Sequence, residues 1–176
     1  MREAFRKLGH EAWSCDLEPA DDGSDWHFQD DLKAVLAVEK FDVLIAHPPC
    51  TCIAVSGNRW YADSEQREQG LDFVRWLMGS TVPRWCIENP ISVISSRIRK
   101  PDQIIQPWQF GHGETKATCL WLKGLPRLKE TNVVEGRQQR VWRMAPSPER
   151  ARLRSETYQG IADAMAEQWG GMKALN

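Results

Sequence analysis

The stretch FDVLIAHPPC, residues 41–50, joins a short apolar run to a loop that carries two prolines and a cysteine. Residues 41–46 have the continuous apolar character of a strand that is buried on both faces in a parallel sheet. Pro48 and Pro49 fix the backbone and keep the loop from continuing as a helix. The stretch therefore predicts an α/β fold in which Cys50 lies in a fixed loop at the carboxyl end of a strand.

The sequence on both sides of this stretch alternates between strand and helix patterns. A helix is expected at 2–8, ended by Gly9, and a polar loop at 19–27. Short apolar runs predict strands, and apolar positions at helical spacing predict helices. Ser64 is expected to cap the helix at 65–78. In chain order these are a strand at 10–15, a helix at 30–39, a strand at 41–46, a helix at 65–78 and a strand at 85–89. This order predicts a mostly parallel sheet with flanking helices.

Polar groups follow each of the three expected strands, and the carboxyl ends of parallel strands collect functional groups. The segments are Asp16-Leu17-Glu18, His47-Pro48-Pro49-Cys50 and Glu88-Asn89-Pro90. A thiol and a carboxylate in one cleft suit nucleophilic chemistry, whereas the alternative is a rigid loop with a packed cysteine. A zinc site from His47, Cys50 and Cys52 lacks the second ligand pair, so no metal is expected.

Length and composition indicate one domain over residues 1–176, since 41% of the 176 residues are hydrophobic. The sequence has neither a run of eighteen apolar residues nor the apolar core of a secretion signal. We therefore expect a soluble intracellular protein without a membrane partner, whose five cysteines are reduced. The GxSxG and GxxxxGK[ST] motifs are also absent, which disfavours serine hydrolases and nucleoside triphosphatases.

Charge is distributed unevenly along the chain, although the net charge is only -1. Residues 1–72 hold seven basic and fifteen acidic residues, whereas residues 97–154 hold thirteen basic and five acidic residues. The basic part is interleaved with aromatic residues, which favours contact with nucleic acid over a merely solvated face.

Three segments in a fixed order resemble motifs of the DNA (cytosine-5) methyltransferases. They are PPCT at 48–51, IENP at 87–90 and RQQRVWR at 137–143. The resemblance is closest to the short phage-type members and extends over about residues 2–170, including the segments at 100–126 and 158–169. It implies a Rossmann-like fold that uses S-adenosylmethionine, in a bacterial cytoplasm, with a phage or mobile element as the source of the gene.

The resemblance also implies catalytic roles. Cys50 would add to C6 of a cytosine, so that C5 accepts the methyl group, and Glu88 would hydrogen-bond the exocyclic amine and N3 of the base. The alternative for Glu88 is a cap on a helix that starts near Ile91. Arg140 would stabilise the activated base, although Trp142 stands where the family has a second arginine. The alternative for Arg140 is contact with phosphate or with solvent.

Cofactor-binding residues are implied in the same way. Asp16 matches the family's acidic residue on the ribose of the cofactor, followed by Leu17, and Asp31 matches the aspartate near the adenine, with Asp30 as an alternative. Pro49 matches a proline on the cofactor side. Residues 158–161 resemble the segment that closes over the methionine end.

Two departures from the family alter the expectation. The family begins with a strand and a glycine-rich turn that embrace the cofactor, and the sequence starts within the following helix, so we expect an N-terminally truncated fold. A second copy or a complementing chain would then cover the unpaired strand edges. In place of a full target-recognition domain, the basic segment around 92–137 would face DNA. The residues expected to contact DNA are Arg97, Arg99, Lys100, Trp108 and Lys116, with Phe110 as a further stacking residue.

The sequence thus predicts transfer of a methyl group from S-adenosylmethionine to C5 of cytosine in DNA through a covalent Cys50 adduct. Two alternatives stay open. One is a catalytically impaired remnant that binds DNA or a partner. The other is a thiol-dependent enzyme that acts on free pyrimidine nucleotides, since addition to C6 serves that chemistry too.

Overall fold

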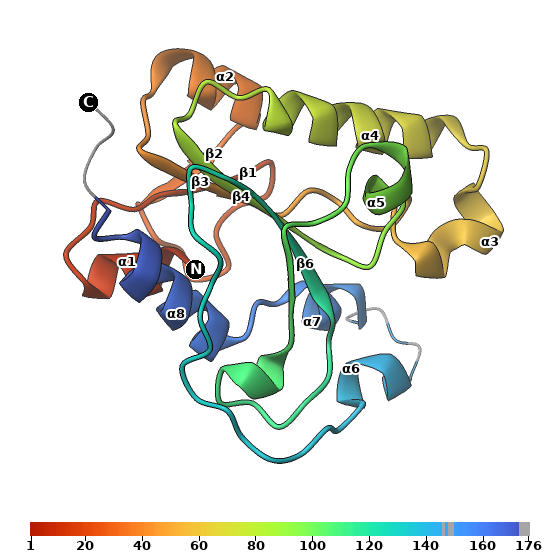
Figure 1. The fold of residues 1–176 in the computed structure, drawn as a ribbon. Coiled ribbons are helices and arrows are strands. Elements are labelled where there is room, and N and C mark those ends of the chain that lie inside the picture. The colour runs from red at the N-terminus through yellow and green to blue at the C-terminus, as the bar shows by residue number, and fades with distance from the viewer. Residues whose placement is uncertain (146, 148–149, 173–176) are drawn as a thin grey trace.

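The computed structural model describes residues 1–145, 147 and 150–172. Figure 1 shows short strands at the centre with helices around them. The helices are α1 (Arg2–Lys7), α2 (Leu32–Val38), α3 (Asn58–Tyr61), α4 (Glu65–Met78), α5 (Ile94–Arg97), α6 (Arg140–Arg143), α7 (Arg150–Ser155) and α8 (Gln159–Trp169). The strands are β1 (Ser14–Asp16), β2 (His27–Gln29), β3 (Val43–Ala46), β4 (Arg84–Pro90), β5 (Gln103–Ile105) and β6 (Thr118–Lys123).

The strands form two sheets, one of two strands and one of four. The larger sheet has the order β3-β4-β6-β5, in which β3 and β4 are parallel and β6 is antiparallel to both of its neighbours. β1 and β2 pair in parallel as a separate sheet. The fold is mixed α/β as expected, but the prediction of a mostly parallel sheet is not confirmed. The chain turns back between β5 and β6 without a crossover helix, so these two strands can only pair in opposite directions.

Several expected elements agree with the structure. Ser64 caps α4 by accepting a hydrogen bond from the Arg67 N–H, and β3 and β4 overlap the strands expected at 41–46 and 85–89. The strand expected at 10–15 was wrong in its bounds, because β1 begins only at Ser14. The loop expected at 19–27 runs into β2, which the sequence did not indicate. Trp13 packs on Trp26 and on Phe28, each with ring centroids 4.7 Å apart, so aromatic contacts between distant residues stabilise this region.

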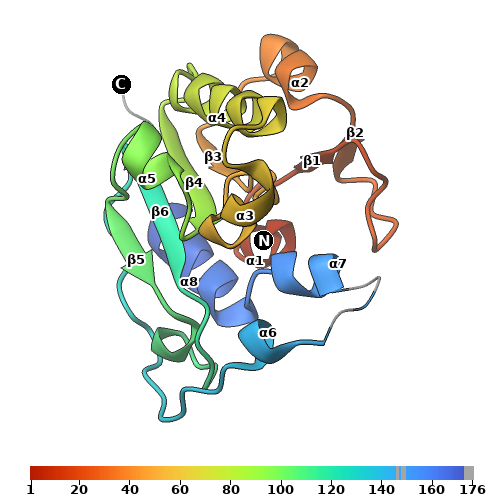
Figure 2. The same ribbon diagram turned by 90° about the vertical axis from the view of Figure 1, so that its right-hand side faces the viewer.

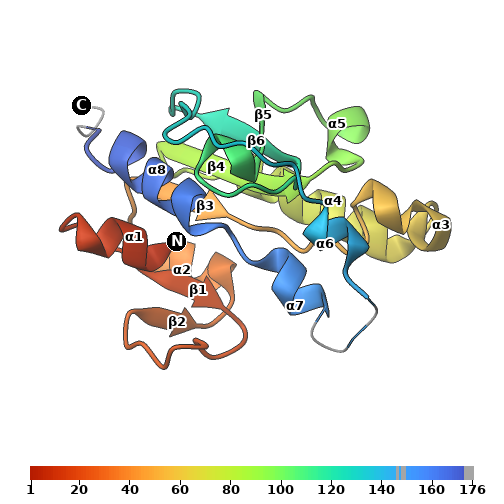
Figure 3. The same ribbon diagram turned by 90° about the horizontal axis from the view of Figure 1, so that it is seen from below.

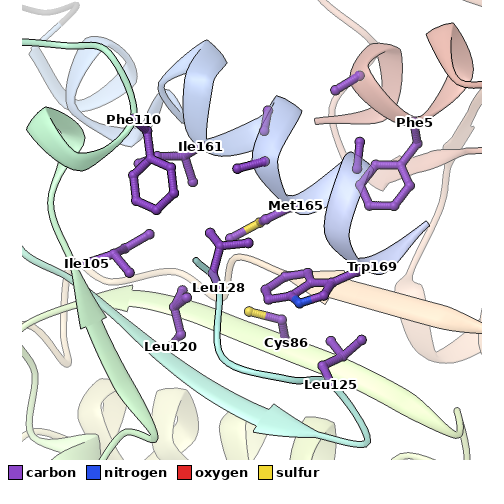
Figure 4. Close-up of a cluster of buried hydrophobic side chains, with 14 residues drawn as sticks. Phe5, Cys86, Ile105, Phe110, Leu120, Leu125, Leu128, Ile161, Met165 and Trp169 are labelled. Atoms are coloured by element: carbon purple, nitrogen blue, oxygen red, sulfur yellow. The ribbon is translucent and has the colours of Figure 1, made fainter. Parts of the chain in front are cut away.

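Two hydrophobic clusters cover the two faces of the larger sheet. On one face α1 and α8 pack on the sheet, and Figure 4 shows Met165 and Trp169 of α8 above Cys86 of β4. On the other face α4 packs on Trp85 and Ile87. Side chains alternate between the faces along a strand, so Glu88 points to the same face as Cys86.

A break in the sheet lies between β1 and β3. Figures 2 and 3 show β1 between β2 and β3, but the described residues give β1 and β3 no hydrogen-bonded strand on their facing edges. A cavity of about 790 Å³ lies between them and is lined by every residue of both strands. Val43, Leu44 and Ile45 are therefore only half-buried, whereas β4 is buried from Arg84 to Asn89.

Candidate active site

The loops after β3 and β4 meet at the carboxyl end of the larger sheet, because Ala46 pairs with Ile87 in parallel register. The next residues are therefore neighbours, and His47 Nδ1 lies 3.4 Å from Glu88 Oε2. The buried Asn89 donates a hydrogen bond from Nδ2 to the Pro48 carbonyl at 3.0 Å. β4 thus fixes the backbone of the proline loop two residues before Cys50.

The Cys50 loop is also fixed on its far side. The Cys50 carbonyl accepts hydrogen bonds from the N–H groups of Ile53, at 3.2 Å, and Ala54, at 2.8 Å. Arg67 of α4 donates from Nε to the Cys52 carbonyl at 2.8 Å. Gly57 closes the turn, since a Cβ there would lie 2.6 Å from the Thr51 carbonyl oxygen. The backbone of the loop that carries the half-buried Cys50 is thereby fixed on both sides.

Glu88 is a buried carboxylate with an unused acceptor. Only 8% of the residue is exposed, and Oε2 accepts no hydrogen bond from any residue that the structure describes, although His47 Nδ1 lies 3.4 Å from it. A buried acceptor without a donor is destabilising, and native proteins rarely keep one unless a ligand or water supplies the donor. Glu88 is therefore suited to accept a hydrogen bond from a bound molecule. The helix cap considered for Glu88 is not formed, because the next helix, α5, has Val93 at its N-cap.

Lys116 is the third charged group at this end of the sheet. It precedes β6, whose first residue, Thr118, pairs with Pro90 at the end of β4. Burial lowers the pKa of the Lys116 ammonium, and the negative charges of Glu88 and Cys50 act in the opposite direction. Lys116 Nζ also donates to the Glu156 carbonyl at 2.8 Å. Sequence reasoning assigned Lys116 to DNA contact, and in the structure Lys116 precedes β6 at the end of the sheet where β4 carries Glu88.

Arg140, the third residue expected to be catalytic, pairs with Glu114. It begins the short helix α6, and its Nε lies 3.0 and 3.1 Å from the two oxygens of Glu114. Tyr158 donates to the same carboxylate at 2.6 Å. Among the described contacts of Arg140, none joins it to Cys50 or Glu88. Its partner Glu114 lies two residues before Lys116.

The residues expected to contact DNA are dispersed. Arg97 pairs with Glu68 at 2.6 Å, and Arg99 pairs with Asp102 at 2.9 Å. Arg99 also donates to the Leu122 carbonyl, near the opposite end of β6 from Lys116.

Lys100 is exposed, and Trp108 is half-buried beneath the Arg137 guanidinium, 3.8 Å from the ring centroid. Phe110 is only 2% exposed and belongs to the core beside α8, so its expected role as a stacking residue is wrong. Its apolar ring is used for packing, as Figure 4 shows next to Ile161.

The residues expected to bind the cofactor lie together. Asp16, Leu17, Asp31 and Pro49 all line the cavity between β1 and β3. Asp16 and Leu17 are exposed, and Asp16 Oδ1 accepts from the Glu18 N–H. Asp31 caps α2 by accepting from the Lys33 N–H at 2.8 Å, so one of its oxygens already has a structural role. The sequence resemblance thus selected residues that share one cavity.

A metal centre and a membrane span were also sought within the described part of the chain. No three His, Cys, Asp or Glu side chains gather there in a way that could hold a metal ion. No helix in the same ranges has the length and apolar character needed to cross a bilayer.

Comparison with known proteins gave no relative. No protein-family model matches the chain, and a search of curated proteins found no match. We therefore derive the function from the residues and their geometry.

Proposed function

We propose that this protein methylates cytosine in DNA at C5, with Cys50 as the nucleophile. The observation that carries the proposal is the cluster at the carboxyl end of the sheet. The loop that carries Cys50, the buried Glu88 carboxylate and the half-buried Lys116 ammonium gather there from three separate segments. Addition of a thiolate to a pyrimidine ring needs a nucleophile, a partner for the ring nitrogens and a positive charge near the developing anion.

The residues of the chain act in a defined order. The Cys50 thiolate forms a bond from Sγ to C6 of the base, and the electron pair of the C5–C6 double bond moves toward C5. One oxygen of the Glu88 carboxyl group would accept a hydrogen bond from the exocyclic amine, and a proton shared between the other oxygen and N3 would stabilise the ring as negative charge develops on it. Once C5 has taken up a methyl group, the C5 proton would pass to solvent, the electron pair of the C5–H bond would restore the C5–C6 double bond, and the Sγ–C6 bond would break with release of the thiolate.

Lys116 takes the role that the sequence had assigned to Arg140. Its ammonium is close enough to Cys50 and Glu88 for their charges to act on it. It would therefore stabilise the negative charge that develops on the ring as Cys50 adds to it. Arg140 is a positioning residue in this arrangement, because it holds Glu114 and hence the segment that leads to Lys116.

The cavity between β1 and β3 fits the methyl donor. It combines apolar walls with carboxylates at its edge, which suits a cofactor that carries an adenine, a ribose and a positively charged sulfonium. Asp16, Leu17, Asp31 and Pro49 would hold it. When bound there, S-adenosylmethionine supplies the methyl group that C5 of the base takes up.

Two exposed tryptophans support a polynucleotide substrate over a free nucleotide. Trp60 of α3 and Trp142 of α6 are each 73% exposed. Figures 1 and 3 show α3 and α6 at the same end of the molecule. Exposed aromatic rings with arginines beside them, here Arg59 and Arg143, stack on unpaired bases and bind phosphates.

The proposal is tested by methyl transfer from S-adenosylmethionine with a tritiated methyl group to a cytosine-rich DNA duplex. We expect label in 5-methylcytosine with the wild type, and a loss of at least about a thousandfold in Cys50→Ala. Cys52→Ala is the matched control, because the hydrogen bond described for Cys52 uses its carbonyl, which the substitution keeps. Equal activity in Cys50→Ala and wild type would overturn the mechanism.

A further inference from the structure

Large apolar side chains are exposed at the end of the molecule that carries the Cys50 loop. Val55 follows this loop and Ile91 follows β4, and the Val55 N–H donates to the Ile91 carbonyl at 3.1 Å. Trp60 lies on α3, a few residues after Val55, and Trp142 lies on α6 at the same end (Figures 1 and 3). Each of these side chains belongs to a residue that is at least 40% exposed. We call Val55, Trp60, Ile91 and Trp142 the apolar rim.

Arginines accompany the apolar rim. The helices α6 and α7 have the sequences RVWR and RARLRS, which hold five arginines and no acidic residue. Figures 1, 2 and 3 show these two helices next to each other. Within the described residues, Arg59 of α3, Arg143 of α6 and Arg154 of α7 take part in no ion pair. Their positive charges can therefore bind phosphates.

Exposed apolar groups together with these arginines fit a DNA strand whose bases are unpaired. In a duplex the faces of the bases are stacked on one another, so a protein reaches only base edges and phosphates unless a base pair opens. In a single strand the faces are accessible and stack on aromatic side chains, while the phosphates bind basic residues. We infer that the apolar rim and its arginines bind single-stranded DNA, so that the site prefers a cytosine that is already unpaired.

The shape of the elements supports the same form of DNA. α3 and α6 are helices of four residues each, which is too short to lie along a major groove as a recognition helix does. Each of them instead presents one tryptophan that is 73% exposed. The inference rests on the proposed function, because it names the form of DNA that reaches the Cys50 site.

The test measures binding to the full chain by fluorescence anisotropy, without a methyl donor. The probe is a labelled cytosine-containing oligonucleotide of about twelve nucleotides, used as a single strand and as a duplex of the same sequence. We expect the single strand to bind about tenfold more tightly than the duplex, since only its bases can stack on the tryptophans.

Variants locate the binding surface. Trp60→Ala and Trp142→Ala should each weaken binding of the single strand by about tenfold and binding of the duplex by about twofold or less, because each removes one stacking ring. Trp142→Phe keeps a ring and should stay within about threefold of the wild type. The control is Trp108→Ala, which removes the half-buried ring beneath Arg137 and should leave the Kd unchanged.

The outcomes separate this inference from the proposed function. Equal Kd values for single strand and duplex, or no binding of the single strand, would overturn the inference. So would a larger loss in Trp108→Ala than in Trp60→Ala and Trp142→Ala, or tighter binding of an RNA of the same sequence. Tight binding of the single strand without methyl transfer to either form of DNA would instead overturn the proposed function and leave the binding surface.

Discussion

Strands β3 and β4 lie side by side and both carry site residues at their carboxyl ends, but their surroundings differ. β4 is hydrogen-bonded on both edges, to β3 and β6, and is buried from Arg84 to Asn89. β3 is paired on one edge within the described structure and borders a cavity of about 790 Å³ on the other. Glu88 therefore stands on a fully packed strand, whereas the expected cofactor residues surround an open space.

Because of this difference, the groups that would attack the base and the groups that would hold the methyl donor lie in differently packed surroundings. The groups that would act on the base, namely Cys50, Glu88 and Lys116, are held by packed elements and by hydrogen bonds such as that from Asn89 to Pro48. The groups that would hold the methyl donor line the cavity between β1 and β3, and no described strand pairs with both of these strands. Attack on the base and transfer of the methyl group are thus expected to depend on different parts of the fold.

The largest effect is expected from Glu88→Gln, which removes the carboxylate at the end of the packed strand β4. Methyl transfer to DNA should fall by about a hundredfold to ten-thousandfold, because a positioned acid or base contributes a factor of this size. The matched control is Glu68→Gln, which changes the same side chain at an exposed position paired with Arg97. Loss of activity in both variants would contradict the specific role of Glu88.

A pair of variants distinguishes Lys116 from Arg140. Lys116→Gln should lower kcat by about a hundredfold to a thousandfold, as expected for a lost charge that stabilises the reacting ring. Arg140→Gln should lower it by tenfold or less, because it loosens only the segment around Glu114. The measurement is kcat and KM for the DNA duplex. A larger kcat loss in Arg140→Gln than in Lys116→Gln would indicate that Arg140, and not Lys116, stabilises the reacting ring.

The packing difference between the strands is tested by two equivalent substitutions. Ile87 on β4 is fully buried, so Ile87→Ala should reduce the free energy of unfolding by about 3 kcal/mol. Ile45 on β3 is half-buried beside the cavity, so Ile45→Ala should cost less than half of that. Urea denaturation gives both values. Equal losses would show that the edge of β3 is packed as tightly as β4.

The smallest effect concerns Glu114, which connects Arg140 to the Lys116 segment. Burial acts to raise its pKa, but hydrogen bonds from Tyr158 and Arg140 outweigh burial and lower the pKa below the ordinary 4.5. A lowered pKa in the folded state adds stability that is present above pH 4.5 and lost as the pH falls through the folded value.

Glu114→Gln should therefore destabilise the protein by about 1 to 2 kcal/mol at pH 7 and should reduce its loss of stability in acid. Thermal unfolding from pH 7 to pH 3 measures both effects. If the stabilities of the wild type and of Glu114→Gln fall in parallel as the pH is lowered, the role of this carboxylate is contradicted.

The sequence predicted those parts of the fold that depend on local patterns. The helix at 65–78 and its Ser64 cap follow from a capping residue before an amphipathic run, and β4 follows from a continuous apolar run. The approach of His47 to Glu88 follows from the same pattern, because the carboxyl ends of neighbouring parallel strands meet.

The remaining features depend on contacts between distant segments. The role that we propose for Lys116 depends on the pairing of β6 with β4, which places Thr118 beside Pro90. Arg140 was chosen from a motif, and the motif did not reveal its pairing with Glu114. Phe110 was assigned to DNA because it lies in a basic segment, but its burial against α8 is a property of the folded core.

The central claim is that Cys50, supported by Glu88 and Lys116, can attack cytosine. It is tested most directly by exchange of the C5 hydrogen. Addition of Cys50 to C6 makes C5 basic, so a DNA duplex with deuterium at C5 of cytosine should lose it to water without any methyl donor. We expect wild-type protein to release deuterium, as followed by mass spectrometry of the nucleosides, and Cys50→Ala to release none above the protein-free rate. Release at the same rate by both proteins, or by neither, would contradict the account.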